Sequence, residues 1–428
     1  MMLDAQSTLL PNGLRVVSAA MPGAQGVSIG FWISAGGRHE PRRWSGISHF
    51  IEHLLFKGTR TRSAREISEA VEGRGGDIDA FTQEESTCYY ARLPAEAAWD
   101  GLGVLADMIR HPRLAADDVA KERDVVIEEI LMYRDQPQHH VEEMLTEQLW
   151  SGHPLGRPLT GTVESLQGIG CREVRCYKER MYTPRNIVAA FAGDVRHEDC
   201  VRRVKRLFPE GARHGVRRPA SAAGRPAAQR RIEIKAKDIE QAHVALGFRL
   251  FGRHDPRRYA LKLLSVALGE NMSSRLFQTI REDHGLAYAI QSGVHLFDDT
   301  GALVVSAGLE RSKVERALAL IVREIGRVAR AGVSDAELER ARDYAIGQLR
   351  LGLEGSTNQM TWIGEHLIGY GRLIAPEQAI EALAAVSPDA VRSLAEGFLS
   401  SRRLSVAMIM PGVTSGTPAR IQEIVRRL

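Results

Sequence analysis

An internal repeat constrains the fold of this 428-residue chain more than any other feature of its sequence. The stretch QGVSIGFWISAGGRHEP at 25–41 resembles QAHVALGFRLFGRHDP at 241–256, and both alternate like strands before ending in Gly-Arg-His-acid-Pro. Two further pairs of segments recur, and the offset stays between 215 and 219 positions throughout. A constant offset over separated matches predicts two domains of one design. The further pairs are 117–124 with 335–343 and 187–195 with 404–413.

A stretch near the midpoint, GARHGVRRPASAAGRPAAQRR, is rich in Gly, Pro, Ala and Arg and has no apolar period, which is typical of a linker. We therefore predict a first domain at 1–212, a linker at 213–230 and a second domain at 231–428. Alternating segments such as 77–82 and 86–93 predict hairpins, and long amphipathic helices follow them. The fold class expected is α+β: two homologous α/β domains, each a mostly antiparallel sheet packed with helices on one side.

Composition and charge exclude several classes of protein. The net charge is only +4, from 57 basic and 53 acidic residues, which argues against a nucleic-acid or anionic-membrane partner. No apolar run reaches the roughly 18 residues of a membrane span, and no secretory signal is visible at the N-terminus. The four cysteines lack Cys-x-x-Cys spacing, so we expect reduced thiols and a cytoplasmic location.

Two histidines and a glutamate stand inside an otherwise apolar run, in the order His49-Phe50-Ile51-Glu52-His53. On a helix His49 and His53 are four residues apart on one face, so their ring nitrogens can converge on one metal ion. Glu52 lies beside the pair, where a carboxylate can reach a water molecule without being a ligand. This order inverts the commoner zinc-protease motif. The alternative is two packed histidines with a glutamate nearby by chance.

A catalytic zinc site needs a third protein ligand, and the helical segment DVAKERDVVIEEILMYRD offers Glu122, Glu128 and Glu129. Glu122 and Glu129 are seven residues apart and share a face, whereas Glu128 points about 100° away from Glu129. Two carboxylates on one face suggest one ligand and one supporting partner. Helix geometry alone leaves open which of the two binds the metal, and a solvated charged face is the alternative.

Together these motifs resemble the pitrilysin-type metallopeptidases, the inverzincin family M16, and most closely its short-subunit bacterial members and the mitochondrial processing peptidase beta subunit. The resemblance covers almost the whole chain. It implies one Zn²⁺ per chain, held by His49, His53 and Glu129, with Glu122 as an outer carboxylate. The other segments that carry it are TLLPNGLRVV at 8–17, GGDIDAFTQEESTCYYARL at 75–93, GHPLGRPLTGT at 152–162 and YTPRNIVAAFAGDV at 182–195.

The resemblance also assigns roles to the second half of the chain. It identifies Arg281 and Tyr288, in SSRLFQTIREDHGLAYAI, as the pair that assists at the scissile carbonyl, and both side chains can donate hydrogen bonds to an oxyanion. The second half has no His-x-x-Glu-His; YALKLLSVALGENMSSR stands where the repeat would place one and lacks both histidines. The first half is thus expected to carry the metal and the second half residues that handle substrate.

Substrate in this family lies as an added strand along a sheet edge, and the matching residues are Asp79, Ala80, Phe81 and Thr82. Many relatives have Asn where this chain has Asp79, so an acid there could favour basic substrates. Pairing through the main chain favours extended or unfolded peptides over folded proteins.

The resemblance implies a zinc-dependent endopeptidase in which Glu52 is the general base on water. The family's closed chamber is a clamshell of four such domains, of which this chain supplies two. We therefore expect a homodimer, with a heterodimer with a related subunit as the alternative. A non-catalytic structural or binding subunit on the same fold, and a metal-dependent hydrolase of another substrate, are the rival functions.

Overall fold

A computed structural model describes residues 3–209 and 231–428, so the predicted linker at 213–230 lies outside the described residues. The described chain forms two compact units, and each unit combines segments from both halves of the sequence. The predicted boundaries, by contrast, divide the chain into contiguous halves. Unit 1 comprises 3–131, 157–209 and 350–377, and unit 2 comprises 132–156, 231–349 and 378–428.

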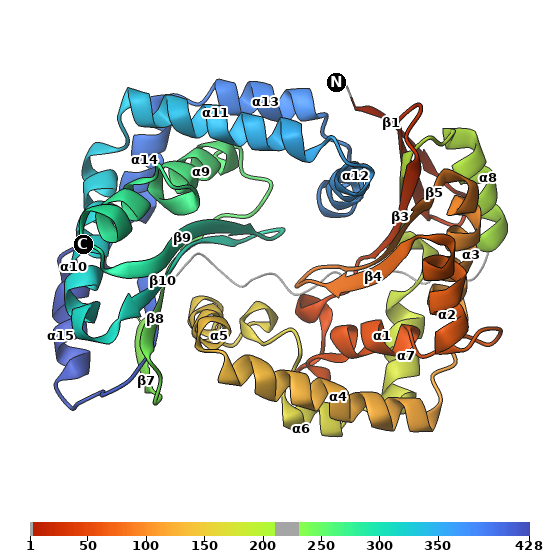
Figure 1. Ribbon diagram of the computed structural model, residues 1–428, viewed down its shortest axis with the longest axis horizontal. Helices are drawn as coiled ribbons and strands as arrows, with labels where there is room; N and C mark the ends of the chain where they lie inside the picture. Colours follow the sequence, from red (N-terminus) through yellow and green to blue (C-terminus); the bar gives the residue numbers. More distant parts are fainter. Residues whose placement is uncertain (1–2, 210–230) are drawn as a thin grey trace. The chain divides into compact units, whose positions relative to one another are not determined.

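Unit 1 is built on a six-stranded sheet with the strand order β1-β2-β6-β3-β5-β4 (Figure 1). Every neighbouring pair is antiparallel except β2 and β6, which run parallel. The predicted hairpin corresponds to β4 and β5, whose alternating polar and apolar residues pair from Asp77 with Arg92 to Thr82 with Thr87. The strands are β1 Asp4–Leu9, β2 Arg15–Ala20, β3 Gly26–Ile33, β4 Asp77–Thr82, β5 Thr87–Pro94 and β6 Ile187–Gly193.

Helices cover both faces of this sheet, whereas the sequence predicted helices on one side. The central strand β3 has apolar residues on both faces: Phe31 belongs to the core beneath α3, and Trp32 packs with residues of α12. Figure 1 shows α3 and α12 on opposite sides of the sheet. A strand buried on both faces needs a second cover, and α12, from the second half of the sequence, supplies it.

The helices of unit 1 begin and end at recognisable signals. Ser63 and Glu66 form the predicted capping box at the start of α2, and Gly75, with φ of 77°, ends the turn that follows it. The α-helices are α1 Ile47–Leu55, α2 Ala64–Val71, α3 Ala98–Arg110, α4 Ala116–Asp135, α6 Val163–Gln167, α7 Cys171–Met181, α8 His197–Leu207 and α12 Ser356–Tyr370. Short 3₁₀ turns span Gly37–His39, Arg42–Trp44, Glu72–Arg74, Ala95–Ala97 and Pro184–Asn186.

Unit 2 has a five-stranded sheet in the order β7-β11-β8-β10-β9, again antiparallel except for one parallel pair, β7 with β11. Its largest core cluster lies between the sheet and α9, α10, α14 and α15, and α5 packs on β8 and β11. The strands are β7 Arg231–Ala236, β8 Gln241–Leu250, β9 Ala287–Leu296, β10 Gly301–Glu310 and β11 Leu404–Met410.

The helices of unit 2 include two stretches of π-helix where the first half of the chain has ordinary α-helix. The α-helices are α5 Pro137–Leu149, α9 Arg258–Ser265, α10 Val314–Ala331, α11 Asp335–Gly352, α13 Pro376–Ala384, α14 Pro388–Phe398 and α15 Thr417–Arg426. The π-helical stretches are η7 Val266–Glu270 and η8 Phe277–Asp283, and 3₁₀ turns span Pro154–Gly156 and Arg311–Lys313.

The order of elements confirms the repeat. From β3 to α8 the first half places a strand, helices, a hairpin, five α-helices, a closing strand and a last helix, and the second half repeats this order from β8 to α15. The helices α5 and α12 occupy equivalent places in the two halves, and each packs on the sheet built mainly by the other half. The predicted fold class, two related domains of sheets packed with helices, is therefore confirmed.

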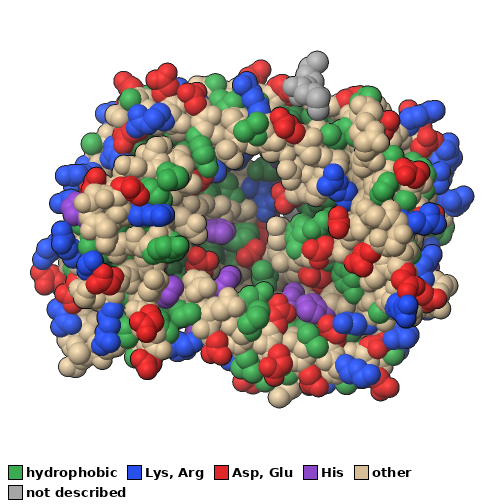
Figure 2. All heavy atoms as spheres, in the orientation of Figure 1, with side chains coloured by type: hydrophobic (Ala, Val, Ile, Leu, Met, Phe, Trp, Pro, Cys, Tyr) green, Lys and Arg blue, Asp and Glu red, His purple; other side chains and the backbone are tan. Residues whose placement is uncertain are grey.

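Among the described residues, none of the helices combines the length and the apolar character needed to cross a membrane. The face of the molecule in Figure 2 shows Lys and Arg side chains interspersed with Asp and Glu. This mixture agrees with the near balance of 57 basic and 53 acidic residues in the sequence.

Candidate metal centre

The helix α1 carries the His-x-x-Glu-His motif. Its apolar side is buried, including Ile47, Phe50 and Ile51, which fixes the opposite side as the one that presents His49 and His53. The start of the helix is capped by a carboxylate from outside it. Oxygens of Glu40 accept hydrogen bonds from the N–H groups of Gly46 (2.7 Å) and Ser48 (2.8 Å). These bonds satisfy N–H groups at the helix start that have no partner within the helix, so Glu40 anchors the helix that bears the motif.

The residue before α1 has to be glycine. Gly46 has φ of 89°, in the left-handed region, and a Cβ atom there would lie 2.4 Å from the carbonyl oxygen of Thr160. Only glycine tolerates both the conformation and the contact. The chain therefore turns sharply into α1 and places the motif directly after the turn.

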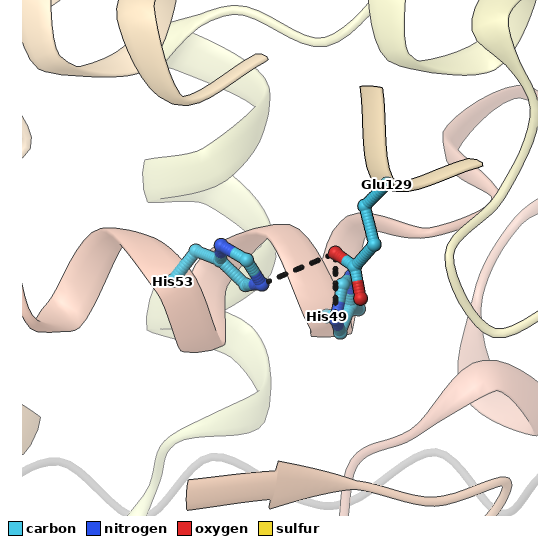
Figure 3. A group of neighbouring side chains, drawn as sticks. All are labelled: His49, His53 and Glu129. Atoms are coloured by element: carbon cyan, nitrogen blue, oxygen red, sulfur yellow. Dashed lines mark ion pairs between the residues drawn. The ribbon is translucent and has the colours of Figure 1, made fainter. Parts of the chain in front are cut away.

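Three side chains from two helices converge (Figure 3): His49 and His53 from α1, and Glu129 from α4. Oε2 of Glu129 lies 3.7 Å from Nε2 of His49 and 3.6 Å from Nε2 of His53. One ligand atom from each residue lies within 4.8 Å of the others. All three side chains are partly buried. The structure thus brings together the three residues that the sequence proposed as ligands.

The donor set fits a tetrahedral zinc ion. Ligand atoms at about 2.0–2.2 Å from one tetrahedral ion are about 3.3–3.6 Å apart, close to the two nitrogen–oxygen distances here. These distances are too long for hydrogen bonds. Oε2 of Glu129 is buried and has no hydrogen-bond partner among the residues that the structure describes. A buried carboxylate oxygen that faces two imidazole nitrogens is an arrangement that a cation would satisfy.

The state of His49 suits metal binding. Burial, followed by the charge of His53, lowers the pKa of His49 to about 4. The imidazole is therefore neutral near pH 7 and keeps a lone pair for a metal ion.

The other histidine is held by a short chain of charged groups. Nδ1 of His53 lies 2.9 Å from Oε1 of Glu122, and Oε2 of Glu122 lies 2.7 Å from Nζ of Lys57. Burial alone would lower the pKa of His53, but the hydrogen bond to Glu122 and the charges of the nearby carboxylates outweigh burial and raise it. Burial alone would raise the pKa of Glu122, but the hydrogen bonds to His53 and Lys57 outweigh burial and lower it.

The contact with Glu122 sets the orientation of the ring. When Nδ1–H of His53 donates to Glu122, Nε2 presents its lone pair toward Glu129 and His49. The structure thus places Glu122 at the Nδ1 side of His53, and Glu129 near its Nε2. Glu128 is exposed and is not one of the three converging residues.

Glu52 stands beside the three converging residues. Its Oε2 accepts a hydrogen bond of 2.5 Å from Oγ1 of Thr82, the last residue of β4. Burial raises the pKa of Glu52 to about 7, against the lowering effect of the bond from Thr82. A carboxylate that titrates near neutral pH can both take up and release a proton under working conditions.

The segment proposed to bind substrate lies on an edge strand. In the sheet order β4 comes last, so its outer edge has no neighbouring strand among the described residues. Asp79 is exposed, and its carboxylate accepts hydrogen bonds from N–H of Ala80 (2.8 Å) and from the hydroxyl of Tyr90 (3.4 Å). Phe81 packs against the cluster that contains Trp32. An exposed edge strand is the feature that strand addition requires.

Arg281 and Tyr288 are neighbours in unit 2. Cζ of Arg281, in η8, lies 5.8 Å from the centre of the Tyr288 ring and 4.8 Å from that of Phe277. Tyr288, at the start of β9, is 78% exposed. A side chain this exposed is accessible to another molecule.

Sequence reasoning missed two members of the site, Glu40 and Lys57. Lys57 is four residues after His53, the same spacing that identified the histidine pair, and this spacing could have pointed to it. Nothing in the local sequence signals that Glu40 caps α1, because the cap acts across the 3₁₀ turn Arg42–Trp44.

Comparisons with known proteins identify the peptidase family that the sequence resembles. Residues 15–163 match the family described as Insulinase (Peptidase family M16), and residues 171–344 match the one described as Peptidase M16 inactive domain. An uncharacterized zinc protease of Mycobacterium tuberculosis is 37% identical over 426 residues, 99% of this chain and 97% of that protein. An uncharacterized zinc protease of Bacillus subtilis is 36% identical, over 94% of this chain and 97% of that protein.

Solved structures share the fold at lower sequence identity. A protease from Helicobacter pylori superimposes with a TM-score of 0.90 at 22% identity, over 96% of this chain and 100% of that one. A peptidase M16 inactive domain from Pseudomonas fluorescens gives a TM-score of 0.87 at 18% identity, over 96% of this chain and 99% of that one.

Proposed function

Since the chain belongs to the insulinase family of peptidases, M16, we propose that it is a zinc-dependent endopeptidase that hydrolyses extended or unfolded peptides. One observation carries the proposal. His49, His53 and Glu129 converge while Glu52 stays outside their cluster, hydrogen-bonded to the edge strand β4. The proposed ligands and the proposed general base are thus different residues, which leaves Glu52 available for a proton of the water.

Each residue of the site has its own role in the proposed hydrolysis. Zinc held by His49, His53 and Glu129 would acidify a water molecule and polarise the peptide carbonyl. Glu52 takes the proton of the water that attacks the carbonyl carbon, and then gives it to the leaving nitrogen as the carbon–nitrogen bond breaks. Glu122 keeps His53 in the tautomer that presents Nε2.

Arg281 and Tyr288 are proposed as donors to the oxyanion. Both can donate hydrogen bonds to the negative charge that develops on the carbonyl oxygen. Their closeness within unit 2 and the exposure of Tyr288 support a joint role. In a homodimer the pair would come from the partner subunit, which is the assembly we propose.

The substrate is proposed to add as a strand along β4. Main-chain pairing with Ala80 and its neighbours accepts any extended backbone and gives little sequence preference. The exposed carboxylate of Asp79 on the same strand favours basic side chains near it. We propose a cytoplasmic location, which the four unpaired cysteines favour.

A quenched, unstructured peptide tests the proposal. We expect cleavage that a chelator abolishes and that zinc restores, and Glu52→Gln should lower the rate at least about 100-fold with its zinc content unchanged. The control is Glu128→Gln, the same change at an exposed position of α4, which should leave the rate as it is. Zinc binding without cleavage by the unaltered protein would instead identify a non-catalytic binding subunit.

A further inference from the structure

The hydrogen bond between Thr82 and Glu52 joins the strand proposed to take the substrate to the proposed base. Thr82 is the last residue of β4, and its pairing partner in the sheet is Thr87 of β5. Just beyond this pair, N–H of Gln83 donates to the carbonyl oxygen of Ser86 at 2.8 Å and closes the hairpin. Thr82 is therefore fixed in the sheet, while Glu52 reaches it from α1.

The neighbouring hydroxyls determine the direction of this bond. Oγ1 of Thr87 is fully buried and donates its one proton to the carbonyl oxygen of Ala35 at 2.9 Å. It lies 3.3 Å from Oγ1 of Thr82, compared with 2.5 Å from Thr82 to the carboxylate of Glu52. A hydroxyl has a single proton, and a bond to a carboxylate is the stronger one. The proton of Thr82 is thus committed to Oε2 of Glu52.

We infer that Thr82 is the positioning residue for Glu52: its hydroxyl holds Oε2, so that Oε1 is the oxygen that takes the proton from water. The inference rests on the proposed function and adds a role for a residue otherwise counted only in the substrate strand. Because Thr82 ends that strand, the base is fixed at the point where an added peptide would leave the sheet edge. The positioning acts on the rate of proton transfer and leaves the pairing of the peptide with β4 to the main chain.

Two variants at one position test it. Thr82→Val removes the hydroxyl and keeps the shape, and Thr82→Ser keeps the hydroxyl. We expect Thr82→Val to lower kcat about 10–100-fold with KM little changed, and Thr82→Ser to stay near the original kcat. The matched control is Thr8→Val on β1, the opposite edge strand, where Oγ1 also bonds a side chain, that of His197 at 2.8 Å. Thr8→Val should leave kcat unchanged.

A binding measurement separates positioning from substrate contact and from misfolding. In a Glu52→Gln background, which we expect to cleave too slowly to consume the peptide, Thr82→Val should change neither the Kd for an extended peptide nor the bound zinc, each within about twofold. A weaker Kd would overturn the inference and make Thr82 a binding residue. Equal loss of kcat in the Ser and Val variants would also overturn it.

The outcomes also distinguish the inference from the proposed function. If Glu52→Gln cleaves as well as the original protein, the proposed function fails. If Glu52→Gln is inactive but Thr82→Val retains full kcat, the endopeptidase stands and the positioning role fails. If Thr82→Val does not fold, Thr82→Ala takes its place in both measurements.

Discussion

His53 contacts two carboxylates of the helix α4, one at each nitrogen of its ring. Oε1 of Glu122 lies 2.9 Å from its Nδ1, and Oε2 of Glu129 lies 3.6 Å from its Nε2. One contact is a hydrogen bond and the other is too long for one. The two nitrogens of the ring therefore contact different carboxylates. Glu122 bonds Nδ1 and orients the ring, whereas Glu129 lies near Nε2 of both His53 and His49.

This arrangement predicts that Glu122 contributes to metal affinity without touching the metal. Glu122→Gln removes the charge that orients His53, and we expect zinc affinity to fall about 10–100-fold. Lys57→Met should give a smaller loss, because it weakens only the support of Glu122. Competition with a chromophoric chelator measures both. Lys121→Met changes the same charge at an exposed residue of α4 and should have no effect; equal affinity in Glu122→Gln would contradict the argument.

At the level of residues, the sequence predicted both histidines, the base and a pair of candidate acids. Helix geometry alone could not choose between Glu122 and Glu129, because the period of a helix gives the face of a residue and not its height along a neighbouring helix; the choice of Glu129 came from the family resemblance. The structure places Glu129 beside both Nε2 atoms and Glu122 beside Nδ1. Thr82 was predicted as part of a strand, but its bond to Glu52 depends on tertiary packing that no local pattern encodes.

Among elements, the contact of α12 with β3 depends on a glycine. A Cβ atom on Gly364 would lie 2.6 Å from ring atoms of Trp32, whose side chain is fully buried. Gly364→Ala should therefore push α12 away from the sheet and lower the free energy of unfolding by about 1–3 kcal/mol. Chemical denaturation measures the change.

The matched control is another helical glycine of the same unit. Nothing lies within 4 Å of a Cβ atom on Gly103 of α3, so Gly103→Ala should be neutral or raise the free energy of unfolding by up to about 1 kcal/mol. Equal stability of Gly364→Ala and Gly103→Ala would show that α12 does not press on Trp32 as described.

The start of α11 is held by an ion pair whose effect depends on pH. Both oxygens of Glu337 bond Arg275, at 2.5 and 2.7 Å, and Oε2 also accepts from N–H of Ser334 at 2.8 Å. Burial alone would raise the pKa of Glu337, but these bonds prevail and lower it to about 2. The unfolded chain has the ordinary value near 4.5, so the stabilisation is present above pH 4.5 and is lost as pH falls toward 2.

Glu337→Gln should therefore lower the free energy of unfolding by roughly 1–3 kcal/mol at pH 7, and the difference from the original protein should close below pH 4.5. Urea denaturation of both proteins between pH 7 and pH 2 measures it. A difference that is independent of pH would mean that Glu337 acts through packing and not through its charge.

Most elements were predictable from sequence because their signals are local. Alternation identified β4 and β5, and the capping box identified the start of α2. The position of α12 was not predictable, because its apolar residues only show that it packs on something. The burial of Trp32 on the far face of β3 needed a partner that lies more than 300 residues away in the sequence.

For the whole molecule, the exchange of α5 and α12 means that neither half of the sequence contains its own complete core. Met360, Ile363 and Leu367 of α12 complete a cluster with Trp32 and Val188 in the first half. In return, residues of α5 complete a cluster with strands of the second half. These are Val141 and Leu145 of α5, with Ala245 and Ala407.

A chain divided within 210–230 should consequently yield two fragments that fold together but not apart. Each fragment alone leaves an apolar sheet face uncovered, which favours aggregation, whereas both together restore each cluster. We expect the separately expressed fragments to be insoluble or to lack cooperative unfolding, and co-expressed fragments to elute as one complex with the secondary structure of the intact chain. Size-exclusion chromatography and circular dichroism measure this. If a fragment alone unfolds cooperatively, its sheet must be stable without the exchanged helix, and the halves would be independent folding units.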